Sequence, residues 1–73
     1  MSNRPTIEQV RERFPQLGYA ERMARDAGQR DTDRYTHWYG MVKPIIVQMI
    51  GINDPAYDVA YQHLYRIYMD VGA

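Results

Sequence analysis

The stretch YTHWYGMVKPIIVQMI, residues 35–50, decides the fold of this chain, because it holds the only tryptophan and the longest aliphatic run. When each residue advances by about 100° around a helix axis, the apolar side chains of this stretch fall within an arc of roughly 140°. The arc contains Tyr35, Trp38, Tyr39, Val42, Ile45, Ile46, Met49 and Ile50. We therefore predict a helix over residues 33–50 whose buried stripe organises the rest of the molecule.

Pro44 lies inside this predicted helix, where a proline lacks the amide hydrogen and presses on the carbonyl group four residues earlier. That earlier residue is Gly40, and both residues lie on the solvent side of the helix. A glycine leaves its carbonyl group room to tilt outward, which favours a kinked but continuous helix. The alternative is two short helices, the second of which has Pro44 at its first position.

Two short helices are predicted before this stretch. Thr6 and Gln9 match a capping box, which opens a helix that ends near Arg13, ahead of Pro15. Gly28 is expected to stop the second helix. The second helix carries a stripe of mostly small apolar residues, namely Leu17, Ala20, Met23, Ala24 and Ala27.

The segment GINDP, residues 51–55, separates two helices. Gly51 ends the first helix, Asp54 caps the second, and Pro55 takes the first position of the second helix. So short a connection predicts an antiparallel hairpin of the helices over residues 33–50 and 55–71. The helix over residues 33–50 has three candidate caps, Asp31, Thr32 and Asp33.

These elements predict one all-α domain over residues 1–73, a small four-helix domain with two short N-terminal helices packed on an antiparallel C-terminal helical hairpin. A chain of this length buries only about 60–65% of its unfolded surface, so its core is small. The chain has no cysteine, which excludes disulfides and thiolate metal sites and fits a reducing compartment. It shows no apolar segment for secretion or for crossing a bilayer, so we expect a cytoplasmic protein.

The last predicted helix carries two stripes that together span about 200°, more than a helix in a small bundle buries against its own chain. One stripe holds Ala56, Ala60, Leu64, Ile67 and Val71; the other holds four tyrosines, with a methionine on the adjoining polar face. One interpretation is a core or homodimer seam, and the other is a recognition surface for another protein. Two short helices cannot cover so wide a face, so a homodimer is expected. The predicted partner-binding residues are Tyr57, Tyr61, Tyr65, Tyr68 and Met69.

The sequence offers little support for chemistry. His37 and His63 are the only histidines, and neither has a second His or a Glu three or four residues away. No Ser or Thr has a histidine placed locally to activate it, and no glycine-rich phosphate loop occurs. We therefore predict no catalytic residue, no metal site and no cofactor, and we expect a protein that is not an enzyme. His63 is expected at a helix edge, near Leu64 and Ile67.

The charge distribution disfavours nucleic acid as a partner. The net charge is zero, whereas a duplex-binding protein is usually basic. Seven of the eight arginines lie in residues 1–34, where they alternate with acidic residues in a pattern typical of surface ion pairing. The arginines expected to pair in this way are Arg22, Arg25 and Arg30, with Glu21, Asp26 and Asp31.

Three functions are considered from these observations. The favoured one is a non-enzymatic protein-binding module that acts through a tyrosine-rich helical surface; the small size fits a phage or mobile-element accessory protein that inhibits a host complex, as anti-CRISPR proteins do. The opening TIEQVRERFPQL, residues 6–17, resembles the start of small phage head–tail connector proteins over a dozen residues. That resemblance implies the alternative of a virion assembly subunit, and no functional residue is carried over from it. The third function is a small nucleic-acid-binding regulator.

Overall fold

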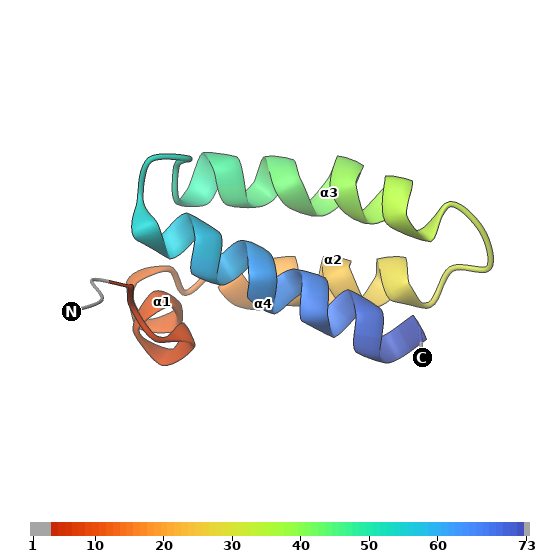
Figure 1. The fold of residues 1–73 in the computed structure, drawn as a ribbon, viewed down its shortest axis with the longest axis horizontal. Helices are drawn as coiled ribbons and strands as arrows, with labels where there is room; N and C mark the ends of the chain where they lie inside the picture. Colours follow the sequence, from red (N-terminus) through yellow and green to blue (C-terminus); the bar gives the residue numbers. More distant parts are fainter. Residues whose placement is uncertain (1–3, 73) are drawn as a thin grey trace.

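The computed structural model describes residues 4–72 of the chain, and within this range the secondary structure consists of four helices without a strand. The helices are α1 (Ile7–Arg13), α2 (Leu17–Gly28), α3 (Arg34–Met49) and α4 (Pro55–Gly72). The predicted all-α class is confirmed. Figure 1 shows α3 and α4 running antiparallel as a hairpin, with α2 alongside both and α1 at the end where α3 turns into α4.

The start of α1 and the start of α4 follow the sequence signals. The backbone amide of Gln9 donates a hydrogen bond to Thr6 Oγ1 at 3.2 Å, and the backbone amide of Thr6 donates one to the Gln9 side-chain Oε1 at 2.9 Å. The predicted capping box is therefore present. Asp54 caps α4, because its Oδ1 accepts a hydrogen bond from the Ala56 amide at 2.9 Å. Gly51 follows α3 with a φ of +95°, the left-handed conformation that favours glycine.

Helix α3 is continuous through Pro44, so the alternative of two short helices is wrong. Asp33 occupies the N-cap position of α3, but its side chain makes no capping hydrogen bond. Its backbone adopts the left-handed conformation at a φ of 58°, and its carbonyl oxygen accepts the hydrogen bond of the His37 amide at 2.8 Å. The helix therefore starts from a turn in the loop and not from a side-chain cap.

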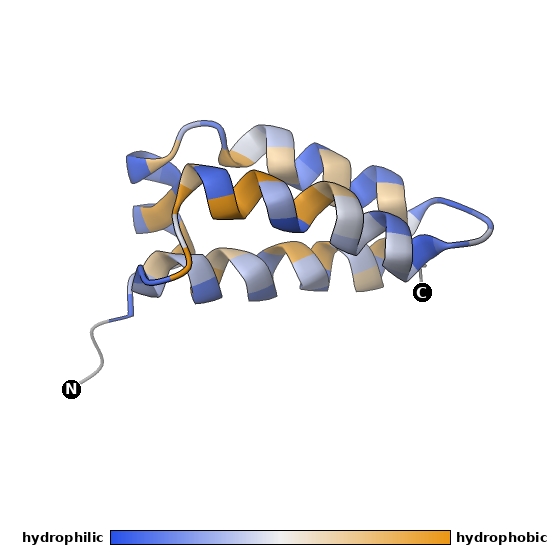
Figure 2. Cartoon of the chain, turned by 90° about the horizontal axis from the view of Figure 1, so that it is seen from above, coloured by the Kyte–Doolittle hydropathy of each residue, from blue (hydrophilic) through white to orange (hydrophobic). Residues whose placement is uncertain are grey.

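Helix α2 packs against both helices of the hairpin and supplies a third of the core. Its small side chains let α4 approach closely, because an alanine stripe holds neighbouring helices nearer than leucine does. Figure 2 shows that the most hydrophobic residues of α3 gather in the half of the helix nearer the α3–α4 loop. The fully buried core residues are Val10, Leu17, Ala20, Ala24, Ala27, Trp38, Val42, Ile46, Ala56, Ala60 and Leu64.

Gly28 marks the closest approach of α2 and α4. A Cβ atom at Gly28 would lie 2.7 Å from the Tyr68 carbonyl oxygen and 3.0 Å from the Val71 Cβ. The side chain of Arg34 fastens this crossing, since its guanidinium donates to the Gly28 carbonyl at 3.1 Å and to the Tyr68 carbonyl at 3.4 Å. Gly28 ends α2 as predicted, but its main role is to let two helix backbones touch.

Trp38 is fully buried and joins the two helices of the hairpin. Its indole Nε1 donates a hydrogen bond to the Leu64 carbonyl oxygen on α4 at 3.2 Å. The hydrogen bond satisfies the one polar atom of an otherwise apolar side chain, which is the usual condition for burying tryptophan. Trp38 therefore fixes the distance and register of α3 against α4.

Three arginine–carboxylate pairs hold the N-terminal segment against the hairpin and α2. Arg4 pairs with Asp58 at 2.8 Å, Arg11 with Glu21 at 2.6 Å, and Arg13 with Asp54 at 3.0 Å. The expected ion pairing of Arg22, Arg25 and Arg30 is not found among the ion pairs of the described residues. The arginines that pair do so between separate elements, which the local alternation of charge does not reveal.

Candidate functional site

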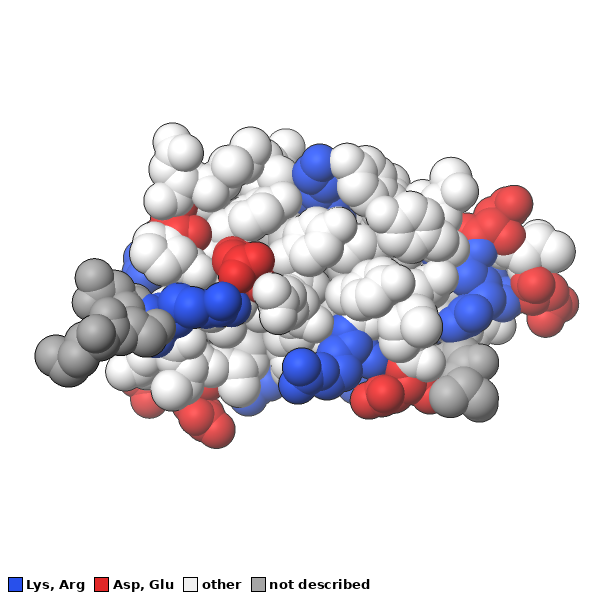
Figure 3. Space-filling view, in the orientation of Figure 1, with Lys and Arg blue, Asp and Glu red and all other residues white. Residues whose placement is uncertain are grey.

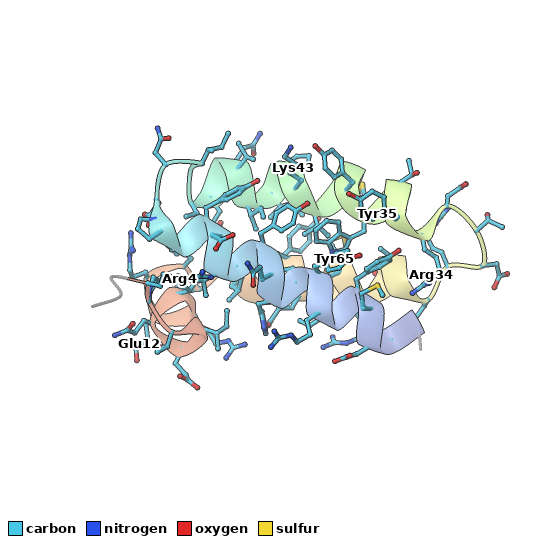
Figure 4. All side chains as sticks on the ribbon, in the orientation of Figure 1. Arg4, Glu12, Arg34, Tyr35, Lys43 and Tyr65 are labelled. Atoms are coloured by element: carbon cyan, nitrogen blue, oxygen red, sulfur yellow. The ribbon has the colours of Figure 1, made fainter. Side chains whose placement is uncertain are left out.

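The exposed aromatic side chains of α3 and α4 gather on one side of the molecule. Figure 4 shows Tyr35 and Tyr65 close together there, with Lys43 on α3 at the edge. We call this surface the aromatic face and define it by five tyrosines. Three of them, Tyr35, Tyr61 and Tyr65, pack against the buried Trp38, and the other two, Tyr39 and Tyr57, pack against Tyr35 and Tyr61.

The rings of the aromatic face contact one another through Trp38. The centroids of Trp38 and Tyr61 lie 5.1 Å apart at an interplanar angle of 89°, and those of Trp38 and Tyr65 lie 5.3 Å apart at 75°. Tyr35 meets Tyr65 edge-on at 6.5 Å. These separations and angles are those of favourable edge-to-face pairs, each of which contributes about 0.5–1.5 kcal/mol beyond burial. The exposed rings are therefore supported from below by a rigid side chain.

The five predicted partner-binding residues do not share one environment. Tyr65 and Met69 are exposed, whereas Tyr57 and Tyr61 are half-buried against the core. Tyr68 is only 4% exposed and belongs to the core, where its ring lies 5.9 Å from Trp38 and 4.9 Å below the Arg34 guanidinium. The prediction that Tyr68 forms part of a contact surface is corrected, because α2 and Arg34 cover the side of α4 on which it lies.

Sequence reasoning placed Tyr35 and Tyr39 in the buried arc of α3, but the structure exposes them. Tyr35 is 51% exposed and Tyr39 41% exposed, although Trp38 between them is fully buried. Tyr39 lies near one edge of the predicted arc, and Tyr35 belongs to the first turn of α3, where neighbouring helices cover less of the surface. The position of Tyr39 near the edge of the arc is the one feature of the sequence that could have predicted its exposure.

The aromatic face carries little charge. Figure 3 shows a mostly uncharged central surface over α3 and α4, with most of the charged side chains near its ends and lower rim. Lys43 lies at the edge of the aromatic face, and its ammonium is 4.5 Å from the centroid of the Tyr39 ring. The hydrogen bond with the Tyr39 hydroxyl raises the pKa of Lys43, and burial raises the pKa of Tyr61. At neutral pH the face therefore presents one ammonium and a neutral Tyr61 hydroxyl.

A second polar group lies away from this face, where α1, α2 and α4 meet. Glu21 Oε2 is 2.6 Å from His63 Nε2 and 2.6 Å from the Arg11 guanidinium. Burial opposes ionisation of Glu21, but the hydrogen bonds from His63 and Arg11 outweigh it and lower the pKa of this carboxyl group. His63 lies at the helix edge as expected, and its partner forty-two residues earlier in the chain was not foreseen.

The Glu21 cluster shows no arrangement for catalysis or metal binding. Its atoms form ion pairs between helices, and Glu21 is the side chain to which His63 is hydrogen-bonded within residues 4–72. In the range 4–72, no three His, Cys, Asp or Glu side chains lie together in a group that would hold a metal ion. The arrangement joins three helices, which is a structural role.

Comparisons with protein-family models, with curated proteins and with solved structures gave no match for this chain. None of the helices within the described residues combines the length and hydropathy that a membrane span requires.

Proposed function

We propose that this chain is a non-enzymatic protein-binding module whose contact surface is the aromatic face. The observation that carries the proposal is the row of partly exposed tyrosine rings packed against one buried tryptophan. Tyrosine and tryptophan are enriched at the centres of protein interfaces, where a few large side chains supply most of the binding free energy.

The support beneath the rings favours binding. An exposed side chain that is ordered only on binding loses about 0.5–1.5 kcal/mol of conformational entropy. Tyr61 and Tyr65 already pack against Trp38, and Tyr35 packs against Tyr65, so little of that loss remains. Isolated surface tyrosines without such support are ordinary in soluble proteins and do not indicate a binding site.

Four of the eight arginines are engaged within the fold, and the net charge of zero disfavours a nucleic-acid partner. Arg4, Arg11 and Arg13 are engaged in ion pairs between elements, and Arg34 donates to two helix carbonyls. These cations are committed to the fold and are poorly placed to neutralise phosphates. A homodimer, a cytoplasmic location and a role in phage inhibition of a host complex stay predictions, as do the assembly-subunit and regulator alternatives.

A comparison of tyrosine variants tests the proposal. We expect Tyr39→Ala combined with Tyr65→Ala to abolish capture of a partner from lysate of the native host, while the far-UV circular dichroism stays unchanged. Tyr61 is left intact because it is half-buried against the core, whereas Tyr65 is exposed. The matched control is Tyr19→Ala, since Tyr19 is an exposed tyrosine of α2 outside the aromatic face. Capture that is lost equally in the control, or retained in the double variant, would remove the aromatic face as the binding site.

A further inference from the structure

The outward side of α4 carries two neighbouring ridges with a groove between them. In a helix, residues four apart form ridges, and the groove between two ridges accepts a ridge of another helix. One ridge of α4 is Tyr57, Tyr61, Tyr65 and Met69; the second is Asp58, Gln62, Arg66 and Asp70. The hollow between them has a volume of about 360 Å³ and is lined by Tyr61, Gln62, Tyr65, Arg66 and Met69. We call this hollow the outer groove.

The charges of the second ridge are complementary to those of the same ridge running in the opposite direction. Asp58 and Arg66 lie one turn on either side of the uncharged Gln62, and Asp70 follows Arg66 one turn later, farther from the crossing point. Asp58 and Arg66 are eight positions apart, which is about 12 Å along a helix. When an identical helix crosses antiparallel with Gln62 at the crossing point, the Asp58 of each copy lies opposite the Arg66 of the other copy.

The contacts within the chain leave both side chains accessible for such a pairing. Asp58 Oδ2 pairs with Arg4 at 2.8 Å, and the Asp58 side chain remains 57% exposed. Its Oδ1 accepts only a long 3.5 Å hydrogen bond from Gln62 Nε2. Arg66 is exposed and takes no part in the ion pairs of the described residues. Each Asp58 therefore keeps one carboxylate oxygen for a second cation.

We propose that a second copy of this chain docks in the outer groove, with α4 crossing α4 about a two-fold axis beside Gln62. The ridge that carries Gln62 in each copy lies in the outer groove of the other copy. The two α4 axes then cross at about 50° from antiparallel, which is the usual angle when ridges of residues four apart interdigitate. Such a contact is isologous and closes as a dimer, because each partner uses the same surface. Tyr61 and Tyr65 of the aromatic face line the groove and are covered in this dimer, whereas Tyr35 and Tyr39 on α3 lie outside it. The inference goes beyond the proposed function and shares Tyr61 and Tyr65 with it, so in the dimer Tyr35 and Tyr39 of each copy are the rings left for a different protein.

Charge reversal tests the pairing. The single variants Asp58→Arg and Arg66→Asp each place like charges opposite one another in both pairs, and we expect each to sediment as a monomer where the wild type sediments as a dimer. In an equimolar mixture of the two variants, both pairs become attractive. We therefore expect the mixture to form a heterodimer in analytical ultracentrifugation. Arg4→Ala is the control for the lost Arg4–Asp58 ion pair, and it should leave dimerisation unchanged.

A cysteine variant tests the geometry without altering charge. The chain has no cysteine, so Gln62→Cys places a single thiol beside the two-fold axis. Under mild oxidation we expect this variant to form a disulfide-linked dimer faster than Gln48→Cys, an exposed control on α3. A wild type that is monomeric at every concentration, a mixture without heterodimer, or equal oxidation of the two cysteine variants would each overturn the proposal.

Discussion

The crossing of α2 and α4 at Gly28 predicts a substitution effect of unusual sign. Replacing glycine by alanine inside a helix ordinarily stabilises a protein by about 0.5–1 kcal/mol. At Gly28 the added Cβ would lie 2.7 Å from the Tyr68 carbonyl oxygen, about 0.7 Å short of ordinary contact. The obstructing atom belongs to a helix backbone, so α2 and α4 must move apart.

The cost of this movement outweighs the gain in helix propensity. Overpacking a well-packed contact costs about 1–3 kcal/mol. The separation also pulls the Gly28 and Tyr68 carbonyls away from the Arg34 guanidinium that bridges them. Gly28 is the last residue of α2, where the propensity gain is smallest. We expect Gly28→Ala to lower the free energy of unfolding by about 1–2 kcal/mol, and to lower Tm by roughly 5–10 °C for a domain of this size.

Gly18→Ala in the same helix is the matched control, because a Cβ at Gly18 would meet no atom within 4 Å beyond its own helix backbone. This variant should be more stable than the wild type by about 0.5–1 kcal/mol. Urea unfolding followed by far-UV circular dichroism measures both variants under the same conditions. If Gly28→Ala is as stable as the wild type, or if the two substitutions shift stability in the same direction, the close approach of α2 and α4 is refuted.

Three further predictions concern single side chains. Trp38→Phe removes the donor to the Leu64 carbonyl and leaves a cavity, so urea unfolding should show a loss of about 1–3 kcal/mol. Arg34→Ala should cost about 1–2 kcal/mol in the same assay, whereas Arg30→Ala, at an exposed loop position, should stay within about 0.5 kcal/mol. Because the pKa of Glu21 is lower in the folded state, its contribution to stability is present above its ordinary value of 4.5 and is lost as pH falls through the folded pKa. Between neutral and acid pH, the free energy of unfolding should therefore depend less steeply on pH in Glu21→Gln than in the wild type. An unchanged slope would show that the contacts of Glu21 with His63 and Arg11 do not stabilise the fold.

The helix limits and hairpin were predictable because their signals are local. Thr6 with Gln9, Gly51, and Asp54 with Pro55 each act on backbone groups within a few residues, and the structure shows each in its expected role. The continuity of α3 through Pro44 also followed from a neighbour, Gly40, four residues away.

The tertiary contacts were not predictable in the same way. Helical periodicity identifies the apolar side of a helix, but it does not say which neighbour covers that side or how far the cover extends. Tyr68 was assigned to a contact surface, although Arg34 lies over its ring. The contact of His63 with Glu21 joins residues forty-two positions apart, and no local pattern marks it.

The packing of α2 against α4 explains why large rings remain at the surface. Ala20 and Ala24 of α2 and Ala56 and Ala60 of α4 are buried where the two helices pack, and Gly28 approaches the Tyr68 carbonyl at the far end. A seam of such small residues brings the two helices too close together to accommodate tyrosine rings between them. The rings on α4 are therefore displaced toward α3 and toward solvent, where Tyr65 meets Tyr35 and both Tyr61 and Tyr65 meet Trp38.

The choice of aromatic residue suits this exposed position. The chain has seven tyrosines and one phenylalanine, so the displaced rings carry hydroxyl groups. A tyrosine hydroxyl keeps its hydrogen bonds to water while the free protein is in solution, and the ring beside it still offers apolar area to a partner. The same five positions filled with phenylalanine would give a face of similar shape that invites aggregation. Tyr39→Phe with Tyr65→Phe should accordingly retain the fold while lowering solubility, and unchanged solubility would argue that these hydroxyl groups do not serve the free protein.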